Sequence, residues 1–517
     1  MRSDRYRSSP ARGGCRDGAG AGRSLGRLGL VAMAAAVLAM PAAAPGRPRA
    51  SLPLGPEPGC GPELSARPAT RAEDYVVVLG GSGADFDKRR SAVSARAVEA
   101  LDRRLHERLG DKILLDYEEA LNGFLAALSA EDLGFICREA AAVGVPVSIA
   151  RDEVIELPPM VEGRSRRLDA KVMRLSVSSD LWPPLGLDRI DQRLLELDFQ
   201  FNPSRSGLGV HVYVIDSGIY AAHDDFKGVS GLTRVVHEVV PQLDTATAAT
   251  AAANAGDCLG HGTAVASIIG GKRHGIARKA ALHSVRVFGC ANTTSVGRVI
   301  KAVDWVTGQR AAHSGWPMVV NMSVSSVERV VQAQGETSSV FGHLNSAVEN
   351  SIKKRITYVI AAGNNSANSS VSACNVSPAL VLTAITVSNT VARSDGRSTA
   401  ANQGPCVDIF APGVDIDVAG RNNPTEEKTL SGTSMAAPHA AGVAALILEG
   451  HQGYTATDVW NAIDFAATTR AKIPAWCGIA NIASNTQEKL LHWGSGSADG
   501  RTDEFPKAAT PACGTKK

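Results

Sequence analysis

The chain has 517 residues, of which 44% are hydrophobic and 20% charged, an ordinary globular composition with room for two or three domains. Its formal net charge is only +3, so electrostatics give no reason to expect nucleic acid or an anionic membrane as a partner.

The first feature along the chain is an apolar run, LGLVAMAAAVLAMPAAA (28–44), behind an Arg-rich start and ending in an Ala-x-Ala pattern. This arrangement is typical of a signal peptide, so we interpret residues 1–44 as one and expect a secreted, extracellular protein. The alternative is an uncleaved membrane anchor, which normally needs about 18 or more apolar residues. Residues 45–72, rich in Pro and Gly, are interpreted as a linker.

Residues 73–158 predict a small α+β, ferredoxin-like domain, because strand and helix patterns follow one another in the order of a split βαβ sandwich. The expected elements are YVVVL (75–79), a helix (91–109), KILLDY (112–117), the ALNGF turn (120–124), a helix (130–143) and a strand (145–149). Residues 159–186 lack periodicity and are interpreted as a processing linker. Its basic GRSRR (163–167) is a site for trypsin-like nicking or simply a solvated loop.

Residues 187–494 predict an α/β fold, a doubly wound and mostly parallel sheet covered on both faces, because continuous apolar strands alternate with helices. The expected strands are 209–215, 281–288, 318–324 and 357–362, and the expected helices are 263–269, 296–307, 341–354 and 434–448. Such sheets place functional sites beyond the carboxyl ends of their strands. Residues 495–517 are interpreted as a C-terminal tail.

Three polar residues fall at such edges. Asp216 follows the strand residues VYVI and opens DSGI, although alone it would pass for a helix cap or a turn residue. His261 lies between glycines in DCLGHGTAVAS, where a structural or metal-binding histidine is the alternative. Ser434 lies in SGTSMAAPHAAG, a turn that leads into an Ala-rich helix whose Pro438 is expected in the tolerated first turn.

These residue types fit acyl transfer. A serine hydroxyl needs a base to take its proton, and the base needs a carboxylate to hold its tautomer, so we predict Asp216, His261 and Ser434 as a catalytic triad. A helix N-terminus offers free N–H groups to a developing oxyanion, and the amide of Asn364, which ends YVIAAGN, would donate beside them. An α/β-hydrolase esterase would instead need GxSxG and the order Ser, acid, His.

In order, DSGI, GHGT, AAGN and SGTSMAAPH resemble the subtilisin family of serine proteases, especially its proteinase K and aqualysin branch. The resemblance covers roughly residues 187–494 and implies a secreted endopeptidase that cleaves proteins or peptides through an acyl-enzyme. It implies no catalytic cofactor; structural Ca²⁺ is an expectation without assigned ligands, and we expect a monomer. YVVVL, ALNGF and DEVIEL (152–157) resemble the family's inhibitory pro-domains, which implies an autoprocessed zymogen; an unrelated α+β module is the alternative.

The sequence departs from the family at the substrate cleft. Relatives end the cleft strand with Ser-Leu-Gly-Gly, so the hydroxymethyl groups of Ser325 and Ser326 would narrow or polarise the pocket. The family's specificity for the P1 residue, whose carbonyl is attacked, therefore does not transfer, and a secreted pseudoprotease that only binds is the second hypothesis. Residues 229–256 exceed the family's length and are interpreted as a solvated excursion. The predicted cleft residues are Ser323, Val324, Ser325, Ala362 and Gly363.

The chain has nine cysteines, which in an exported protein suggest disulfides. We expect Cys15 to leave with the signal peptide and Cys60 and Cys137 with the pro-region. By the family resemblance, Cys258 pairs with Cys290 and Cys374 with Cys406, although Cys258 could also be a free buried thiol. Cys477 and Cys513 remain as a third candidate pair. No C-x2-C spacing occurs, so a Zn site is not expected.

Overall fold

The computed structural model describes residues 72–80, 94–157, 161–162, 183–195, 197–238, 240, 243, 256–326, 340–365, 371–469, 479 and 482–493. The expected signal peptide, nearly all of the linker, GRSRR and the C-terminal tail lie outside these residues, as do Cys15, Cys60, Cys477 and Cys513. The chain divides into the units Met1–Leu54 and Gly55–Lys517, and every described residue belongs to the second. Within that described part, none of the helices combines the length and apolarity needed to cross a membrane.

The N-terminal domain is a four-stranded antiparallel sheet with the strand order β2-β3-β1-β4. The order matches the ferredoxin-like arrangement expected from the sequence. Helix α3 starts with a capping box, in which Ser129 and Asp132 each bond the other's backbone N–H, and stops at Gly144, whose φ is 68°. The elements are β1 (Glu73–Leu79), α2 (Ala95–Leu109), η2 (Gly110–Lys112), β2 (Ile113–Tyr117), β3 (Gly123–Leu128), α3 (Ala130–Val143) and β4 (Val147–Arg151).

The main domain is built on a seven-stranded sheet with the order β14-β13-β12-β11-β7-β9-β8. All its pairs are parallel, which confirms the doubly wound α/β fold. Strand β8 lies in the stretch expected to be a solvated excursion, where it instead extends the sheet beside β9. The strands are β7 (His211–Asp216), β8 (Val235–His237), β9 (Ala281–Arg286), β11 (Met318–Met322), β12 (Thr357–Ala361), β13 (Ile385–Val391) and β14 (Ile409–Val414).

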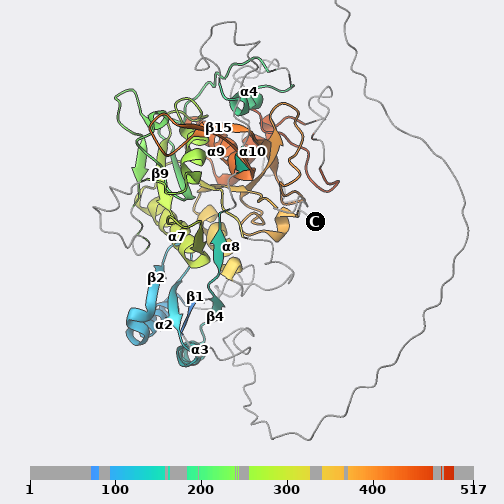
Figure 1. Cartoon of the computed structure of the whole chain (residues 1–517). Coiled ribbons are helices and arrows are strands. Elements are labelled where there is room, and N and C mark those ends of the chain that lie inside the picture. The colour runs from blue at the N-terminus through green and yellow to red at the C-terminus, as the bar shows by residue number, and fades with distance from the viewer. Residues whose placement is uncertain are drawn as a thin grey trace, which may run out of the picture. The chain divides into compact units, whose positions relative to one another are not determined.

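Helices cover both faces of this sheet, because the strand residues alternate between two cores (Figure 1). On β7, Tyr213 and Ile215 belong to the core that contains α7 and α8, whereas Val212 and Val214 belong to the core that contains α6 and α9. The helices are α4 (Leu185–Asp191), η4 (Asp224–Phe226), α6 (His261–Gly270), α7 (Val296–Ala312), α8 (Val340–Lys353), η5 (Ala373–Asn375), α9 (Thr433–Gly450) and α10 (Ala456–Ala466).

Pro438 is the sixth residue of α9, so the prediction that it lies in the first turn was wrong by one turn. The helix begins at Thr433, one residue before the expected start. Proline has no N–H, so the carbonyl of Ser434, four residues earlier, loses its helical donor. The hydroxyl of Ser323 takes that place and donates to the carbonyl oxygen over 3.1 Å.

Two short strands connect the small domain with the main domain. β5 (Val154–Glu156) pairs antiparallel with β10 (Thr293–Ser295), and β6 (Val161–Glu162) pairs antiparallel with β16 (Glu427–Ser431), which also pairs with β15 (Ile416–Ala419). Residues 161–162 were expected in an irregular connector. Val76, Val78 and Tyr117 of the small domain share one hydrophobic core with α7 and α8.

Both predicted disulfides are present and confirm the pairing. Cys258 bonds Cys290 and Cys374 bonds Cys406, with Cα atoms 4.9 and 5.2 Å apart. Cys258 is therefore not a free thiol. Each bridge joins residues 32 positions apart, which on the chain-entropy model stabilises the fold by about 3–4 kcal/mol.

Candidate active site

The centre of the candidate site is a buried carboxylate and imidazole pair. Asp216 is the last residue of β7, and His261 is the first residue of α6. Nδ1 of His261 lies 2.8 Å from Oδ1 and 3.0 Å from Oδ2 of Asp216. Burial lowers the pKa of His261, but the charge and hydrogen bond of Asp216, helped by the charge of Asp257, outweigh it, so the net pKa is raised above 6.5. The imidazole is thus held with Nδ1 toward the carboxylate.

A second buried carboxylate, Asp257, fixes the turn before His261. Its Oδ1 accepts the hydroxyl of Ser217 at 2.7 Å and the backbone N–H groups of Leu259 at 2.9 Å and Gly260 at 2.7 Å. Its Oδ2 accepts both the backbone N–H and the hydroxyl of Thr263, each at 2.9 Å. The sequence reasoning quoted Asp257 only as part of the histidine motif. The feature of the sequence that could have identified it is an Asp shortly before a helix start, where carboxylates commonly accept free N–H groups.

Ser434 lies at the second position of α9, buried to 5% exposure. Its backbone N–H is one of those that a helix N-terminus leaves without an internal partner. The hydroxyl donates to the carbonyl oxygen of Ser323 over 3.3 Å. The expected hydrogen bond to His261 is not formed: within the described part of the chain, the buried Nε2 of His261 has no partner. A change of the serine χ1 rotamer is the motion that would redirect the hydroxyl.

Asn364 follows β12 and lies beside the start of α9. Its Oδ1 accepts the backbone N–H of Thr433 at 3.0 Å, and the hydroxyl of Thr433 in turn accepts the N–H of Gly363 at 3.2 Å. Since the oxygen of the Asn364 amide is engaged, its Nδ2 group is the end left to donate. A methyl group placed on Gly432 would lie 3.3 Å from this Nδ2, so the amide faces the turn that carries Ser434.

The predicted cleft residues come from the segments after β11 and β12. Ser323 is bound to Ser434 by both of its oxygens, as donor and as acceptor. Val324 is fully buried in the core, whereas Ser325 is half-buried. Ala362 and Gly363 are held by Asn402, whose Nδ2 donates to the carbonyl of Ala362 at 2.9 Å and whose N–H donates to that of Gly363 at 3.0 Å.

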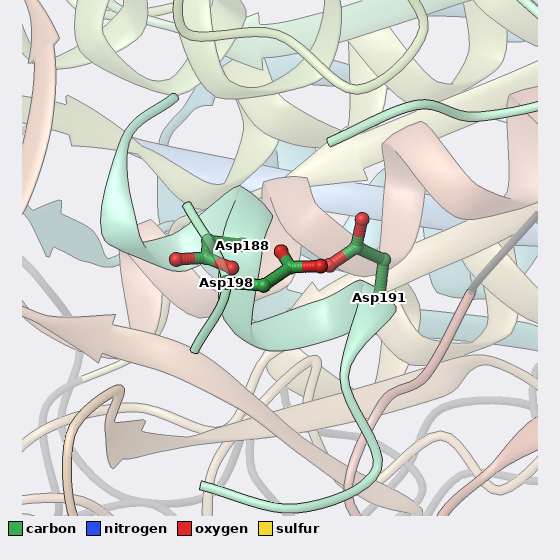
Figure 2. Close-up of side chains that lie close together, drawn as sticks. All are labelled: Asp188, Asp191 and Asp198. Carbon is green, nitrogen blue, oxygen red and sulfur yellow. The ribbon is translucent and has the colours of Figure 1, made fainter. Parts of the chain in front are cut away.

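An acidic cluster that the sequence reasoning did not assign lies on and just after α4. Figure 2 shows Asp188, Asp191 and Asp198 side by side, and one carboxylate oxygen from each lies within 4.8 Å of those of the other two. Burial and neighbouring carboxylates raise the pKa of Asp188 to about 6 and that of Asp191 to about 8. One buried oxygen of each of these two has no partner within the described residues. Carboxylate oxygens are the ligands that Ca²⁺ prefers, so the cluster fits this cation.

Comparison with known proteins gives one family match and several relatives. The model of the subtilase family matches residues 207–489. Alkaline serine exoprotease A of Vibrio alginolyticus is 38% identical over 355 residues, which are 68% of this chain and 56% of the relative. An extracellular serine proteinase of Thermus sp. (strain Rt41A) is 38% identical over 330 residues, 64% of this chain and 72% of the relative.

A cuticle-degrading serine protease of Arthrobotrys oligospora is 35% identical over 272 residues, covering 52% of this chain and 59% of that protein. The chain thus spans little more than half the length of two of these three relatives. Among solved structures, that of a cold adapted subtilisin-like serine proteinase is 36% identical and covers 60% of this chain and 98% of that one, with a TM-score of 0.48.

Proposed function

The chain belongs to the subtilase family, and on that premise we propose that it is a secreted serine endopeptidase, made as a zymogen that processes itself. The observation that carries the proposal is the buried Asp216–His261 pair, whose Nε2 has no partner within the described residues, in a domain that also presents Ser434 at a helix N-terminus. A buried imidazole oriented by a carboxylate is what a serine needs to become a nucleophile.

In the proposed reaction, Ser434 turns its hydroxyl from the carbonyl of Ser323 toward Nε2 of His261. The imidazole takes the proton as the serine oxygen attacks the peptide carbonyl, and Asp216 stabilises the imidazolium that forms. The backbone N–H of Ser434 and Nδ2 of Asn364 donate to the oxyanion. His261 then protonates the leaving amine, and water hydrolyses the acyl-enzyme by the same route.

The alternative is a fold that binds peptides without cleaving them, and the hydrogen bond from Ser434 to Ser323 favours it. The test is to express the full chain and its Ser434→Ala variant and to follow self-cleavage and casein hydrolysis. We expect both in the parent protein and neither in the variant. An intact, inactive parent would support the binding protein instead.

The small domain is the proposed intramolecular inhibitor. Its end runs along the main domain as an added strand, with Leu157 donating its N–H to the carbonyl of Asn292 at 2.8 Å, and extended substrates bind to exposed strands in the same way. After three further residues, Val161 pairs with Ser431, which precedes Ser434 by three positions. The chain is therefore paired with the main domain both before and after residues 158–160, and the second pair lies close in sequence to the candidate nucleophile.

Carboxylates reinforce the contact between the two domains. Asp304 of α7 accepts the backbone N–H groups of residues 118–120 at 2.7–3.1 Å. Asp152 of the small domain accepts the N–H of Gly297 at 2.9 Å, near the start of the same helix. Hydrogen bonds to charged groups contribute about 1.5–3 kcal/mol each, so these contacts suit a domain that binds tightly before it is removed.

We further propose that Asp188, Asp191 and Asp198 hold a structural Ca²⁺ that neutralises their repulsion and takes no part in the chemistry. The helix that carries the first two packs on the nucleophile helix: a methyl group placed on Gly186 would lie 2.3 Å from Nε2 of His439 in α9. A cation bound at α4 would therefore strengthen the support of the helix that presents Ser434.

A further inference from the structure

The space next to the reacting atoms is bounded by three chain segments that are bonded together. The attacked carbonyl has to lie between Ser434 and Nδ2 of Asn364, so the side chain attached to it enters beside these two residues. Residues 323–326 form one wall, because Ser323 is bonded to Ser434. Residues 362–364 form the other, because they lead into Asn364.

Residues 376–377 connect to the first wall. The N–H of Ser326 donates to the carbonyl of Ser377 at 2.8 Å, and the N–H of Ser377 donates to the hydroxyl of Ser326 at 3.0 Å. This reciprocal pair is buried. On the second wall, Asn402 bonds the two carbonyls of residues 362–363. Both walls are therefore fixed by hydrogen bonds, and opening them would leave buried polar groups without partners.

The three segments approach one another at Gly363. A methyl group placed on this glycine would lie 3.4 Å from Oγ of Ser325, 3.4 Å from Cγ1 of Val376 and 2.7 Å from Nδ2 of Asn402. A single carbon atom added to Gly363 would thus already contact Ser325, Val376 and Asn402. A phenyl ring between two walls needs about 3.5–4.0 Å to the atoms on each face, so its walls must be about 7 Å apart or more.

From this geometry we propose that Ser325 and Val376 close the P1 pocket to large side chains, so that the enzyme cleaves after small residues such as alanine. The inference rests on the proposed peptidase function. Ser325 contributes most where the pocket opens, since it is half-buried, whereas Val376 is 3% exposed and fills the base. A hydrophobic pocket discriminates a single methylene by about 10- to 200-fold, so excluding a phenyl ring is a large effect.

The test uses the self-processed protein with two tetrapeptide p-nitroanilides that differ only in P1, alanine or phenylalanine. We expect the parent enzyme to favour alanine in kcat/KM by at least about 10-fold. Ser325→Gly and Val376→Ala each open the pocket and are expected to raise the phenylalanine-to-alanine ratio by about 10-fold or more, with Ser325→Ala in between. Ser230→Gly, in the exposed loop before the edge strand β8, is the matched control and is expected to leave the ratio unchanged.

Two failures are distinguishable. If neither anilide is cleaved by any folded variant, the peptidase function itself is refuted. If the parent cleaves both anilides equally or prefers phenylalanine, or if both Ser325→Gly and Val376→Ala leave the ratio unchanged while activity persists, the peptidase stands and the small-residue pocket is overturned. If Ser325→Gly does not fold, the Val376→Ala variant alone tests the small-residue pocket.

Discussion

Replacing Asp257 by asparagine tests whether this carboxylate holds His261 in place. The change conserves shape but replaces Oδ2 with an NH₂ group that faces the N–H of Thr263, leaving that buried donor without an acceptor. The opposite amide orientation is worse, because NH₂ would then face the N–H groups of Leu259 and Gly260. The Thr263 hydroxyl can accept from the new NH₂ group, but its N–H loses a hydrogen bond to a charged group, which costs up to about 3 kcal/mol of unfolding free energy.

For a domain of about 300 residues, a loss of about 3 kcal/mol corresponds to a Tm lower by about 4–5 °C. Scanning calorimetry on the Ser434→Ala background measures it without self-digestion. Asp417→Asn is the control, because Asp417 is half-buried and its carboxylate accepts the hydroxyl of Thr429. In the active protein, removing the Asp257 charge lowers the pKa of His261, so the acid limb of kcat/KM moves to lower pH. An unchanged Tm together with an unmoved acid limb would refute the role assigned to Asp257.

Three other expectations follow from the charges of the site. Because the net pKa of His261 is raised and only the neutral imidazole accepts a proton, kcat/KM falls as the pH drops through a value above 6.5; a limb centred below 6.5 contradicts this. The raised pKa values of Asp188 and Asp191 mean that the metal-free fold binds more protons than the unfolded chain, so with a chelator Tm falls from about pH 4 to 8. Added Ca²⁺ should abolish that fall, and an identical Tm profile with and without Ca²⁺ would exclude the cation site. Asp304→Ala removes the acceptor of the N–H groups of residues 118–120, so hydrogen exchange of these amides in the full-length Ser434→Ala protein should rise by about 10-fold or more, whereas unchanged protection would exclude the contact.

The sequence predicted best what depends on patterns of several residues. The apolar strands around β7 and β12 were found because a sheet buried on both faces needs continuous hydrophobic runs. The polar residues at their ends were found because parallel strands end at one edge, and Asp216 and His261 do meet there. Strands β6 and β8 were missed, since two or three residues carry no readable period. The longer strands β13 and β14 were not predicted either.

These sequence patterns could not predict the hydrogen-bond partners of individual side chains. The orientation of the Ser434 hydroxyl depends on which acceptor its rotamer meets, and no motif encodes that. The acidic cluster needs the chain to return from Asp191 to Asp198, and Phe199, the residue directly after this return, has a positive φ of 60°. Asp257 was visible in the sequence, but its five donors come from residues that only the folded turn brings together.

Because of Pro438, the position of Ser434 depends on two chain segments and not on the start of α9 alone. The carbonyl of Ser434 depends on a hydroxyl 111 residues away in the chain, and the same serine accepts the Ser434 hydroxyl on its own carbonyl. A peptide bound along the segment that contains Ser323 would affect both of these hydrogen bonds together. We therefore expect substitutions in the segment around Ser323 to change the orientation of the Ser434 hydroxyl, even where they do not contact a bound peptide.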